Sequence, residues 1–254
     1  MSSSSSQLRV SDLSISFNGL PALSNVSLEL GANEVVGIIG PNGAGKTTLF
    51  NALSGLVTGS GSLEIAGEKR AWPKPHQLVE IGIARTLQGV GLFPELTVVE
   101  NVMIGATRFA KAGLIGAAFN RITRDEKALR ERAMIALEKV YAASLANEIV
   151  ATLPYPVTKR IAIARAIVSE PRILMLDEPA GGLGATDIEW MNSLIHNLSL
   201  QMSILLVEHH MDVVMNVCDR IYVLNFGEVI AAGKPGEVRA NPAVIEAYLG
   251  VQNS

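Results

Sequence analysis

The sequence is poor in cysteine and in charged residues. Its 254 residues include one cysteine, Cys218, so no disulfide bond can form within the chain, which fits a reducing compartment. Asp, Glu, Lys and Arg make up 18% of the residues, against about 25% in typical globular domains. With a net charge of −3 the chain has no basic surplus, so we expect no nucleic-acid partner.

Export signals and long apolar runs are also lacking. The serine-rich N-terminus has neither the basic segment nor the apolar segment of a signal peptide. The most apolar stretch, residues 102–119, contains Arg108 and Lys111, and no segment reaches about 18 uninterrupted apolar residues. We therefore expect no membrane span, a disordered tail at residues 1–7 and a short tail at residues 251–254.

Apolar residues are nevertheless abundant. They make up 48% of the chain, and the mean hydropathy is +0.31. Either a partner covers part of an apolar surface, or the chain forms a parallel sheet whose strands are buried on both faces. Both interpretations are compatible with the sequence, whose length suits one large α/β domain or a core with an added lobe.

The apolar run 35–39 is predicted to be a buried strand, and the glycine-rich segment directly after it is the most informative motif. It fits the phosphate-binding pattern G-x-x-x-x-G-K-[ST] and consists of Gly40, Pro41, Asn42, Gly43, Ala44, Gly45, Lys46, Thr47 and Thr48. We expect a helix to begin near Lys46, with its free N–H groups and positive dipole end directed at the phosphates. Lys46 would contact the β- and γ-phosphates, and the Thr47 hydroxyl would hold Mg²⁺. The motif predicts a site for a nucleoside triphosphate.

Two later apolar strands also end in polar residues. The run 173–176 ends in Asp177 and Glu178, where Asp177 would bind Mg²⁺ at the carboxyl edge of the sheet and Glu178 would polarise the attacking water. The run 204–207 leads to His209, which could donate a hydrogen bond to the γ-phosphate. Taken alone, each could be an ordinary strand-terminal or surface residue, but together with the phosphate loop they predict a hydrolytic site.

Two further residues are candidates for nucleotide contacts. Gln88 could contact Mg²⁺ or the attacking water, and an ordinary polar loop residue is the alternative. Phe17 stands at the end of a predicted strand and could stack on adenine, although an aromatic residue there is often part of the core.

The hydrophobic pattern predicts two kinds of region. Early strands indicate an antiparallel sheet beside the nucleotide core, at residues 8–17, 26–30 and 62–66. Helices are predicted at residues 98–104 and 124–141, and Thr123 and Glu126 could form a capping box for the second helix. Beyond residue 161 strands and helices alternate, with strands at 173–176, 204–207 and 220–225 and helices at 188–198 and 211–217.

Taken together, the motifs resemble those of ABC transporter ATPase subunits, in the same order over essentially the whole chain. The closer resemblance is to the ATPases of branched-chain amino acid importers. It is carried by the stretches Arg85–Gln88, Leu92–Val98, Glu100–Val102, Cys218–Asn225 and the ending 241–250.

The resemblance implies an α/β fold: a P-loop NTPase core of the ABC type with an N-terminal antiparallel β-subdomain and an α-helical subdomain. The ATPase domain would span residues 8–250, with the core at 8–91 and 166–250 and the helical subdomain at 92–165. It also implies ATP and Mg²⁺ as cofactors, ATP hydrolysis coupled to uptake of branched-chain amino acids or similar small polar solutes, and a peripheral position on the cytoplasmic face of the membrane. Expected partners are membrane permease subunits, a second ATPase subunit in a homo- or heterodimer and, indirectly, a solute-binding protein.

One stretch departs from the family pattern. Where this subgroup tends to Leu-Pro-Tyr-Gly-Gln, the chain has Leu153, Pro154, Tyr155, Pro156 and Val157. Pro156 removes a backbone N–H, although a proline is tolerated in the first turn of a helix. Losing one phosphate donor typically costs ~100- to 1000-fold in rate. We therefore hypothesise an asymmetric pair of ATPases, with a hydrolysis-poor regulatory subunit as the alternative.

An ATPase acting on DNA or ribosomes is a further alternative. Such proteins tend to carry long coiled-coil insertions or tandem ATPase domains, and the sequence contains neither. The acidic charge balance also argues against this class.

Overall fold

The computed structural model describes residues 6–87, 89–110 and 121–249. The chain divides into two compact units. Residues Met1–Ile83 and Arg172–Ser254 form the first, here called the core unit, and Ala84–Pro171 form the second, the helical unit. The sequence predicted a helical subdomain at residues 92–165. In the structure the helical unit begins eight residues earlier, at Ala84, and ends six residues later, at Pro171.

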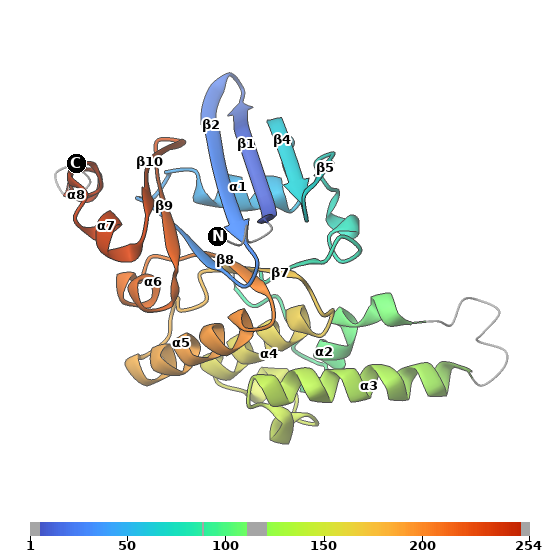
Figure 1. The fold of residues 1–254 in the computed structure, drawn as a ribbon. Helices are drawn as coiled ribbons and strands as arrows, with labels where there is room; N and C mark the ends of the chain where they lie inside the picture. The colour runs from blue at the N-terminus through green and yellow to red at the C-terminus, as the bar shows by residue number, and fades with distance from the viewer. Residues whose placement is uncertain (1–5, 88, 111–120, 250–254) are drawn as a thin grey trace. The chain divides into compact units, whose positions relative to one another are not determined.

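A six-stranded sheet organises the core unit (Figure 1). Its order is β10 (Glu228–Gly233), β9 (Arg220–Asn225), β3 (Val35–Ile39), β8 (Ser203–Val207), β7 (Ile173–Asp177) and β6 (Ile83–Arg85), and the chain passes from the core unit into the helical unit within β6. The strands β9, β3, β8 and β7 are parallel, and β10 is antiparallel to β9. Every residue of β3, β7 and β8 is buried, which explains the apolar runs 35–39, 173–176 and 204–207 within them. The buried strand predicted before the phosphate loop is confirmed.

A second, four-stranded antiparallel sheet belongs to the same unit. Its order is β2 (Leu20–Gly31), β1 (Ser6–Phe17), β4 (Ser60–Ile65) and β5 (Glu68–Arg70). This confirms the antiparallel subdomain expected from the early strands. β1 already begins at Ser6, which pairs with Gly31, and the Gln7 carbonyl accepts a hydrogen bond from the Ala66 N–H. Residues 6 and 7 are therefore strand rather than tail, because two neighbouring strands supply their backbone partners.

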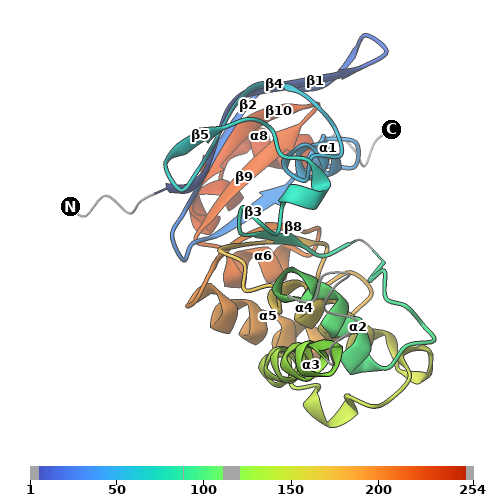
Figure 2. The ribbon, with the colours of Figure 1, turned by 90° about the vertical axis from the view of Figure 1, so that its right-hand side faces the viewer.

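Helices fill the space between and beside the sheets. One of them is α1 (Lys46–Leu53), which Figure 2 shows within the core unit. Its residues Leu49, Phe50 and Leu53 belong to one hydrophobic cluster with residues of both sheets. The remaining helices of the core unit are α5 (Ala185–Ser199), α6 (Met211–Val217), α7 (Pro235–Arg239) and α8 (Pro242–Leu249), with a 3₁₀ turn at Pro75–Gln77. α5 and α6 contact each other, and each has a buried apolar face.

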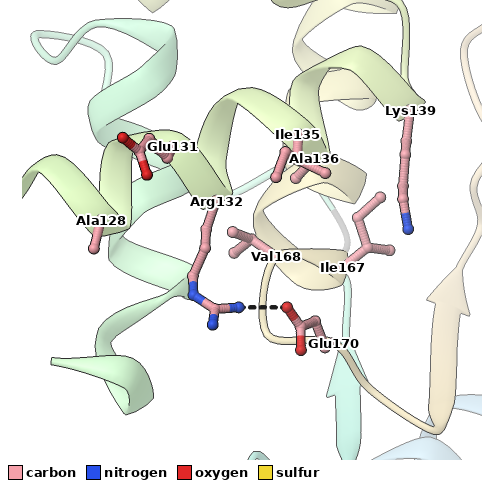
Figure 3. A pocket seen from close by; sticks show the side chains of 9 residues that line it. All are labelled: Ala128, Glu131, Arg132, Ile135, Ala136, Lys139, Ile167, Val168 and Glu170. Carbon is pink, nitrogen blue, oxygen red and sulfur yellow. Dashed lines mark hydrogen bonds and ion pairs between the residues drawn. The ribbon is translucent and has the colours of Figure 1, made fainter.

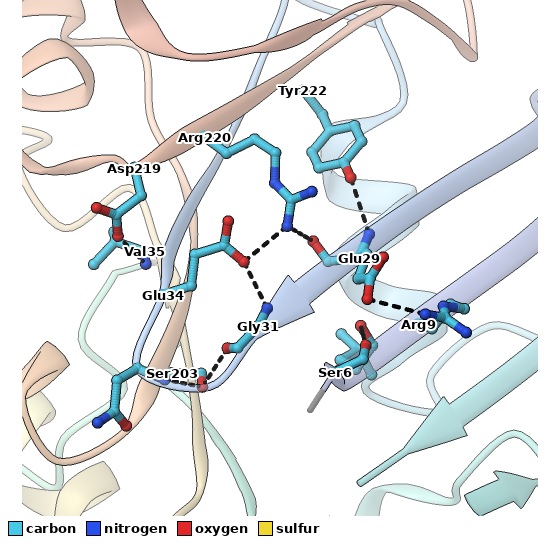
Figure 4. Close-up of polar contacts among 12 residues, drawn as sticks. Ser6, Arg9, Glu29, Gly31, Glu34, Val35, Ser203, Asp219, Arg220 and Tyr222 are labelled. Atoms are coloured by element: carbon cyan, nitrogen blue, oxygen red, sulfur yellow. Dashed lines mark hydrogen bonds and ion pairs between the residues drawn. The ribbon is translucent and has the colours of Figure 1, made fainter. Parts of the chain in front are cut away.

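A polar network joins the two sheets of the core unit at the start of β9 (Figure 4). The Arg220 guanidinium donates to Oε2 of Glu34 at 2.8 Å and to the Glu29 carbonyl at 3.2 Å. The same Glu34 oxygen accepts the Gly31 N–H at 2.5 Å. The Tyr222 hydroxyl, also on β9, accepts the Glu29 N–H at 3.1 Å. The network holds β2 against β9.

The helical unit consists mainly of three helices that pack against one another. They are α2 (Val98–Gly105), α3 (Arg121–Lys139) and α4 (Tyr155–Ile167), with 3₁₀ turns at Thr107–Phe109, Ala143–Leu145 and Val150–Thr152. The predicted capping box is wrong, because α3 begins at Arg121 and Thr123 lies inside it. α2 has such a box instead, formed by Thr97 and Glu100. Within the described ranges no helix has the length and apolar character needed to cross a membrane.

Candidate nucleotide site

The phosphate loop connects β3 to α1. Gly45 occupies the N-cap position of α1 with φ of 104°, a left-handed conformation that favours glycine. A Cβ atom at Gly45 would lie 2.6 Å from Cδ2 of Leu23 and 2.9 Å from the Ala22 carbonyl oxygen. At Gly40 it would lie 2.0 Å from the Leu224 carbonyl oxygen. Both glycines are therefore required for the loop to pass this close to the neighbouring backbone.

The Lys46 side chain is buried and binds the backbone of the phosphate loop. Its side chain is 6% exposed, and its Nζ donates to the carbonyl oxygens of Gly40 at 2.6 Å and Pro41 at 2.8 Å. Burial lowers the pKa of Lys46, and the nearby carboxylate of Glu178 opposes this shift. The loop thus holds a cationic group whose desolvation an anionic ligand would offset.

The loop faces an open cleft of about 460 Å³ in the core unit. The lining residues come from the phosphate loop and the start of α1, from the start of β2, and from the ends of three strands of the large sheet: Asn42, Gly43, Ala44, Gly45, Lys46, Thr47, Thr48, Pro21, Ala22, Glu178, His209 and Phe226. The fold therefore brings the phosphate loop, Glu178 and His209, which are far apart in the sequence, to one surface.

Glu178 and His209 contact each other at this surface. His209 Nε2 lies 2.6 Å from Oε1 of Glu178. Glu178 has a left-handed backbone, with φ of 49°, and its N–H donates to the Val207 carbonyl at 2.9 Å. A non-glycine residue in this conformation is strained and is often found at functional sites. β7 and β8 are neighbours in the sheet, so the two side chains meet at its carboxyl edge.

Glu208 is a residue that the sequence analysis passed over. Its side chain is buried, and its two carboxylate oxygens accept three backbone N–H groups. Oε1 accepts from Ala180 at 2.6 Å, and Oε2 accepts from His209 at 2.7 Å and His210 at 3.1 Å. An acidic residue directly after a fully buried strand was the signal available in the sequence.

Thr47 and Asp177 are the oxygen donors suited to Mg²⁺. Thr47 is the second residue of α1 and lines the cleft, and Asp177 is the last, buried residue of β7. The described residues contain no group of three or more His, Cys, Asp or Glu arranged to hold a metal. This donor set fits Mg²⁺, which is commonly held by one or two carboxylates while substrate phosphates and water complete its coordination.

The other predicted nucleotide contacts differ in their positions. Gln88 lies outside the described residues. Phe17 is 48% exposed at the end of β1 and is absent from the cleft lining. Phe226, which the sequence analysis missed, is 87% exposed in the turn between β9 and β10 and does line the cleft. Its signal was an aromatic residue before Gly227 in a short turn between two strands.

The stretch 153–157, which departs from the family pattern, lies at the start of α4 in the helical unit. Pro154 is the N-cap residue, and Tyr155 and Pro156 are the first two helical residues. The N–H groups of Val157 and Thr158 donate to the Pro154 carbonyl at 3.0 Å and 3.2 Å. Pro156 therefore fits the first turn without breaking the helix, as the sequence predicted.

A separate hollow of about 380 Å³ lies in the helical unit, between α3 and the end of α4 (Figure 3). Arg132 extends from α3 and forms an ion pair with Glu170. The lining also includes the exposed Ile135 and the buried Ile167 and Val168. Its lining contains no glycine-rich loop and no acid–histidine pair, so the cleft of the core unit is the candidate nucleotide site.

The fold and the cleft define the class of the protein: a P-loop nucleotide-binding α/β protein. Residues 23–181 match the ABC transporter family, and residues 228–252 match the family described as branched-chain amino acid ATP-binding cassette transporter. The chain belongs to the ABC transporter family. It is accordingly an ATPase cassette whose activity is coupled to transport.

Two curated relatives and two solved structures illustrate the similarity. The chain is 42% identical to the high-affinity branched-chain amino acid transport ATP-binding protein LivG of Salmonella typhimurium, over 96% of this chain and 97% of LivG. It is 40% identical to the corresponding BraF of Pseudomonas aeruginosa, over 96% and 97%. The ADP conformation of MJ1267, an ATP-binding cassette, is 28% identical with a TM-score of 0.84, over 96% and 99% of the two chains. The dimeric cassette MJ0796 is 26% identical with a TM-score of 0.76, over 90% and 98%.

Proposed function

We propose that this chain is the ATP-binding and hydrolysing subunit of an importer for branched-chain amino acids or similar small polar solutes. One observation carries the hydrolytic part: the Glu178–His209 pair, 2.6 Å apart, lines the same cleft as Lys46 and the phosphate loop. The class of solute rests on the similarity to LivG and BraF and on the match of residues 228–252.

Each predicted site residue has a task in ATP hydrolysis. The loop N–H groups and Lys46 neutralise the β- and γ-phosphates, and the ribose and base extend toward the aromatic residues Phe17 or Phe226. Glu178 polarises the attacking water, and His209 holds that carboxylate and donates toward the γ-phosphate. Gln88 would contact the attacking water or the metal and would link nucleotide state to the helical unit. Thr47 and Asp177 would hold Mg²⁺, which would supply positive charge to balance the negative charge that develops on the phosphates.

Membership of the family supports the following proposal for the assembly. A second ATPase subunit pairs with this chain, as in the dimeric relative, and the pair binds membrane permeases on the cytoplasmic face of the membrane, with the helical unit as the contact. A solute-binding protein acts on the other side. Pro156 supports an asymmetric pair, because the α4 terminus of this chain offers one N–H group fewer to a nucleotide held by the second ATPase.

Uptake by the reconstituted transporter tests the proposal. Vesicles that contain the permeases and both ATPases are loaded with ATP, and import of labelled leucine is measured in the presence of the binding protein. Lys46→Ala abolishes both ATP binding and import, whereas Glu178→Gln abolishes import and ATP turnover but retains ATP binding. Lys69→Ala, at an exposed lysine of β5, is the control and leaves all three unchanged.

The outcomes separate the competing functions. Import of another small polar solute but not of leucine would exclude branched-chain amino acids and leave the other solutes of the proposal. Import of neither would overturn the class of solute alone. Unchanged ATP turnover of the assembled complex with Glu178→Gln would favour the alternative, a regulatory or hydrolysis-poor subunit. Failure of the unsubstituted chain to bind ATP with Mg²⁺ would overturn the proposal as a whole.

A further inference from the structure

Glu208 lies between the two loops that carry the hydrolytic pair. It directly follows β8, and β8 is the strand between β3 and β7. The residue is 1% exposed. Oε1 reaches the loop after Glu178, where it accepts the Ala180 N–H at 2.6 Å, and Oε2 accepts the His209 N–H at 2.7 Å. One buried carboxylate thus joins the segment of Glu178 to the segment of His209.

These contacts extend the hydrogen bonding of the sheet beyond its last strand pair. Asp177 is the last residue of β7 paired with β8, opposite Val207. The Glu178 N–H then donates to the Val207 carbonyl, and the Ala180 N–H donates to the Glu208 side chain. Beyond the ends of both strands, the side chain of Glu208 supplies the acceptor that a further strand residue would otherwise provide. It therefore fixes the separation of the two loops.

We propose that Glu208 is a positioning residue for ATP hydrolysis: it sets the geometry of Glu178 and His209 without touching the nucleotide. The inference rests on the proposed hydrolytic role of that pair. Its side chain is absent from the cleft lining, whereas those of both partners are present. A displacement of about 1 Å between reacting groups can cost on the order of 100-fold in rate.

The chemistry of the site requires a carboxylate. All three contacts come from backbone donors, so both side-chain oxygens must accept. A carboxylate offers two acceptor oxygens, whereas the amide of glutamine offers one oxygen and an NH₂ group that can only donate. Glu208→Gln keeps the shape of the side chain, but its NH₂ group then faces a backbone N–H in one of the two loops, and neither group can accept a hydrogen bond.

The test separates positioning from binding and from stability. In the assembled transporter, Glu208→Gln lowers kcat for ATP roughly 10- to 100-fold, while the Kd for ATP stays within about twofold. The matched control is Glu34→Gln, the same substitution at the network of Figure 4, where it removes the negative charge paired with Arg220. The control leaves kcat unchanged, even if both variants lower the melting temperature.

A double-mutant cycle identifies the residue through which Glu208 acts. In a His209→Ala background, Glu208→Gln lowers kcat by less than about threefold further, because the pair it aligns is already broken. If Glu208→Gln fails to fold, the same cycle uses Glu208→Asp, which keeps both acceptors but is one methylene shorter.

Two results overturn the inference. The first is a kcat of Glu208→Gln equal to that of the unsubstituted transporter. The second is a loss of kcat from Glu208→Gln that is as large in the His209→Ala background as in the unsubstituted transporter. If the unsubstituted complex neither binds nor hydrolyses ATP, the proposed function fails and this inference fails with it.

Discussion

At the scale of single residues, a buried lysine gives the site its charge and its dependence on pH. Lys46 has two backbone carbonyl oxygens as hydrogen-bond acceptors, and burial lowers its pKa below the ordinary lysine value. An arriving triphosphate supplies the negative charge that these neutral oxygens lack. Binding of the nucleotide therefore favours the protonated form of Lys46.

This linkage predicts a loss of ATP affinity at alkaline pH. Below the lowered pKa the ammonium group is present and ATP binds, and above it the neutral amine has no charge to offer. We expect the Kd for ATP to rise with pH before the ordinary titration range of lysine is reached. Titration with a fluorescent ATP analogue at several pH values measures this. A constant Kd up to the ordinary lysine range would contradict the prediction.

The aromatic contact with the base is a second property of single residues. Stacking of a base on an aromatic side chain is worth about 1–3 kcal/mol. If Phe17 stacks on adenine as proposed, Phe17→Ala weakens ATP binding about tenfold and leaves binding of tripolyphosphate, which has no base, unchanged. Phe226→Ala is the comparison variant, because Phe226 lines the cleft. A larger loss in that variant, again confined to ATP, would assign the contact to Phe226.

At the scale of elements, β3 packs closely against α6 and against Cys218, the residue directly after α6. This packing limits the size of the side chains in β3, the strand before the phosphate loop. The buried residue Gly37 lies at the middle of β3. A Cβ atom there would lie 2.7 Å from Sγ of Cys218 and 3.5 Å from Cγ1 of Val214. Burial raises the pKa of the Cys218 thiol, as expected for a packed side chain rather than a reactive one.

Overpacking at this contact predicts a loss of stability that a second substitution relieves. Gly37→Ala lowers the free energy of unfolding by about 1–3 kcal/mol. Adding Cys218→Ala removes the crowded sulfur and recovers most of that loss, so the two effects are not additive. Urea unfolding measures both.

The control for this prediction is Gly236→Ala in α7, where a new Cβ meets no atom within 4 Å. This variant keeps or slightly raises the stability. Fully additive effects of Gly37→Ala and Cys218→Ala would contradict the proposed contact.

At the scale of the whole molecule, the two units carry different parts of the proposed mechanism. The core unit contains the cleft with its hydrolytic pair, and the helical unit contains the α4 terminus that begins with Pro154, Tyr155 and Pro156. A pair of identical chains would use this terminus at both nucleotides. A mixed pair would use it at one.

The asymmetric pair predicts dependence on a second ATPase. Alone, this chain binds ATP but turns it over slowly, because Pro156 lacks one preorganised donor, a loss typically worth ~100- to 1000-fold in rate. Adding the second ATPase subunit raises turnover, and Pro156→Gly raises the turnover of the isolated chain. A coupled-enzyme assay for ADP release measures these rates. Rapid cooperative turnover by the isolated, unsubstituted chain would contradict the asymmetric pair.

Local patterns were enough to predict most elements. β3, β9 and α6 begin and end in the structure at the residues predicted, because apolar runs and the glycines and polar residues beside them are local signals. The sequence chose the wrong capping box, Thr123 with Glu126, and overlooked Thr97 with Glu100. The two have the same spacing, and only the helix boundaries distinguish them. β10, α7 and α8 were also not predicted.

By itself, the sequence determined the phosphate loop, the buried strand before it and the polar residues that end the other strands. These follow from residue types at short spacing. Only the tertiary structure decided that β8 lies between β3 and β7, which brings His209 to Glu178 and makes Glu208 the link between their loops. Parallel strands pair across long stretches of chain, so their order depends on the packing of the whole sheet and not on any local pattern.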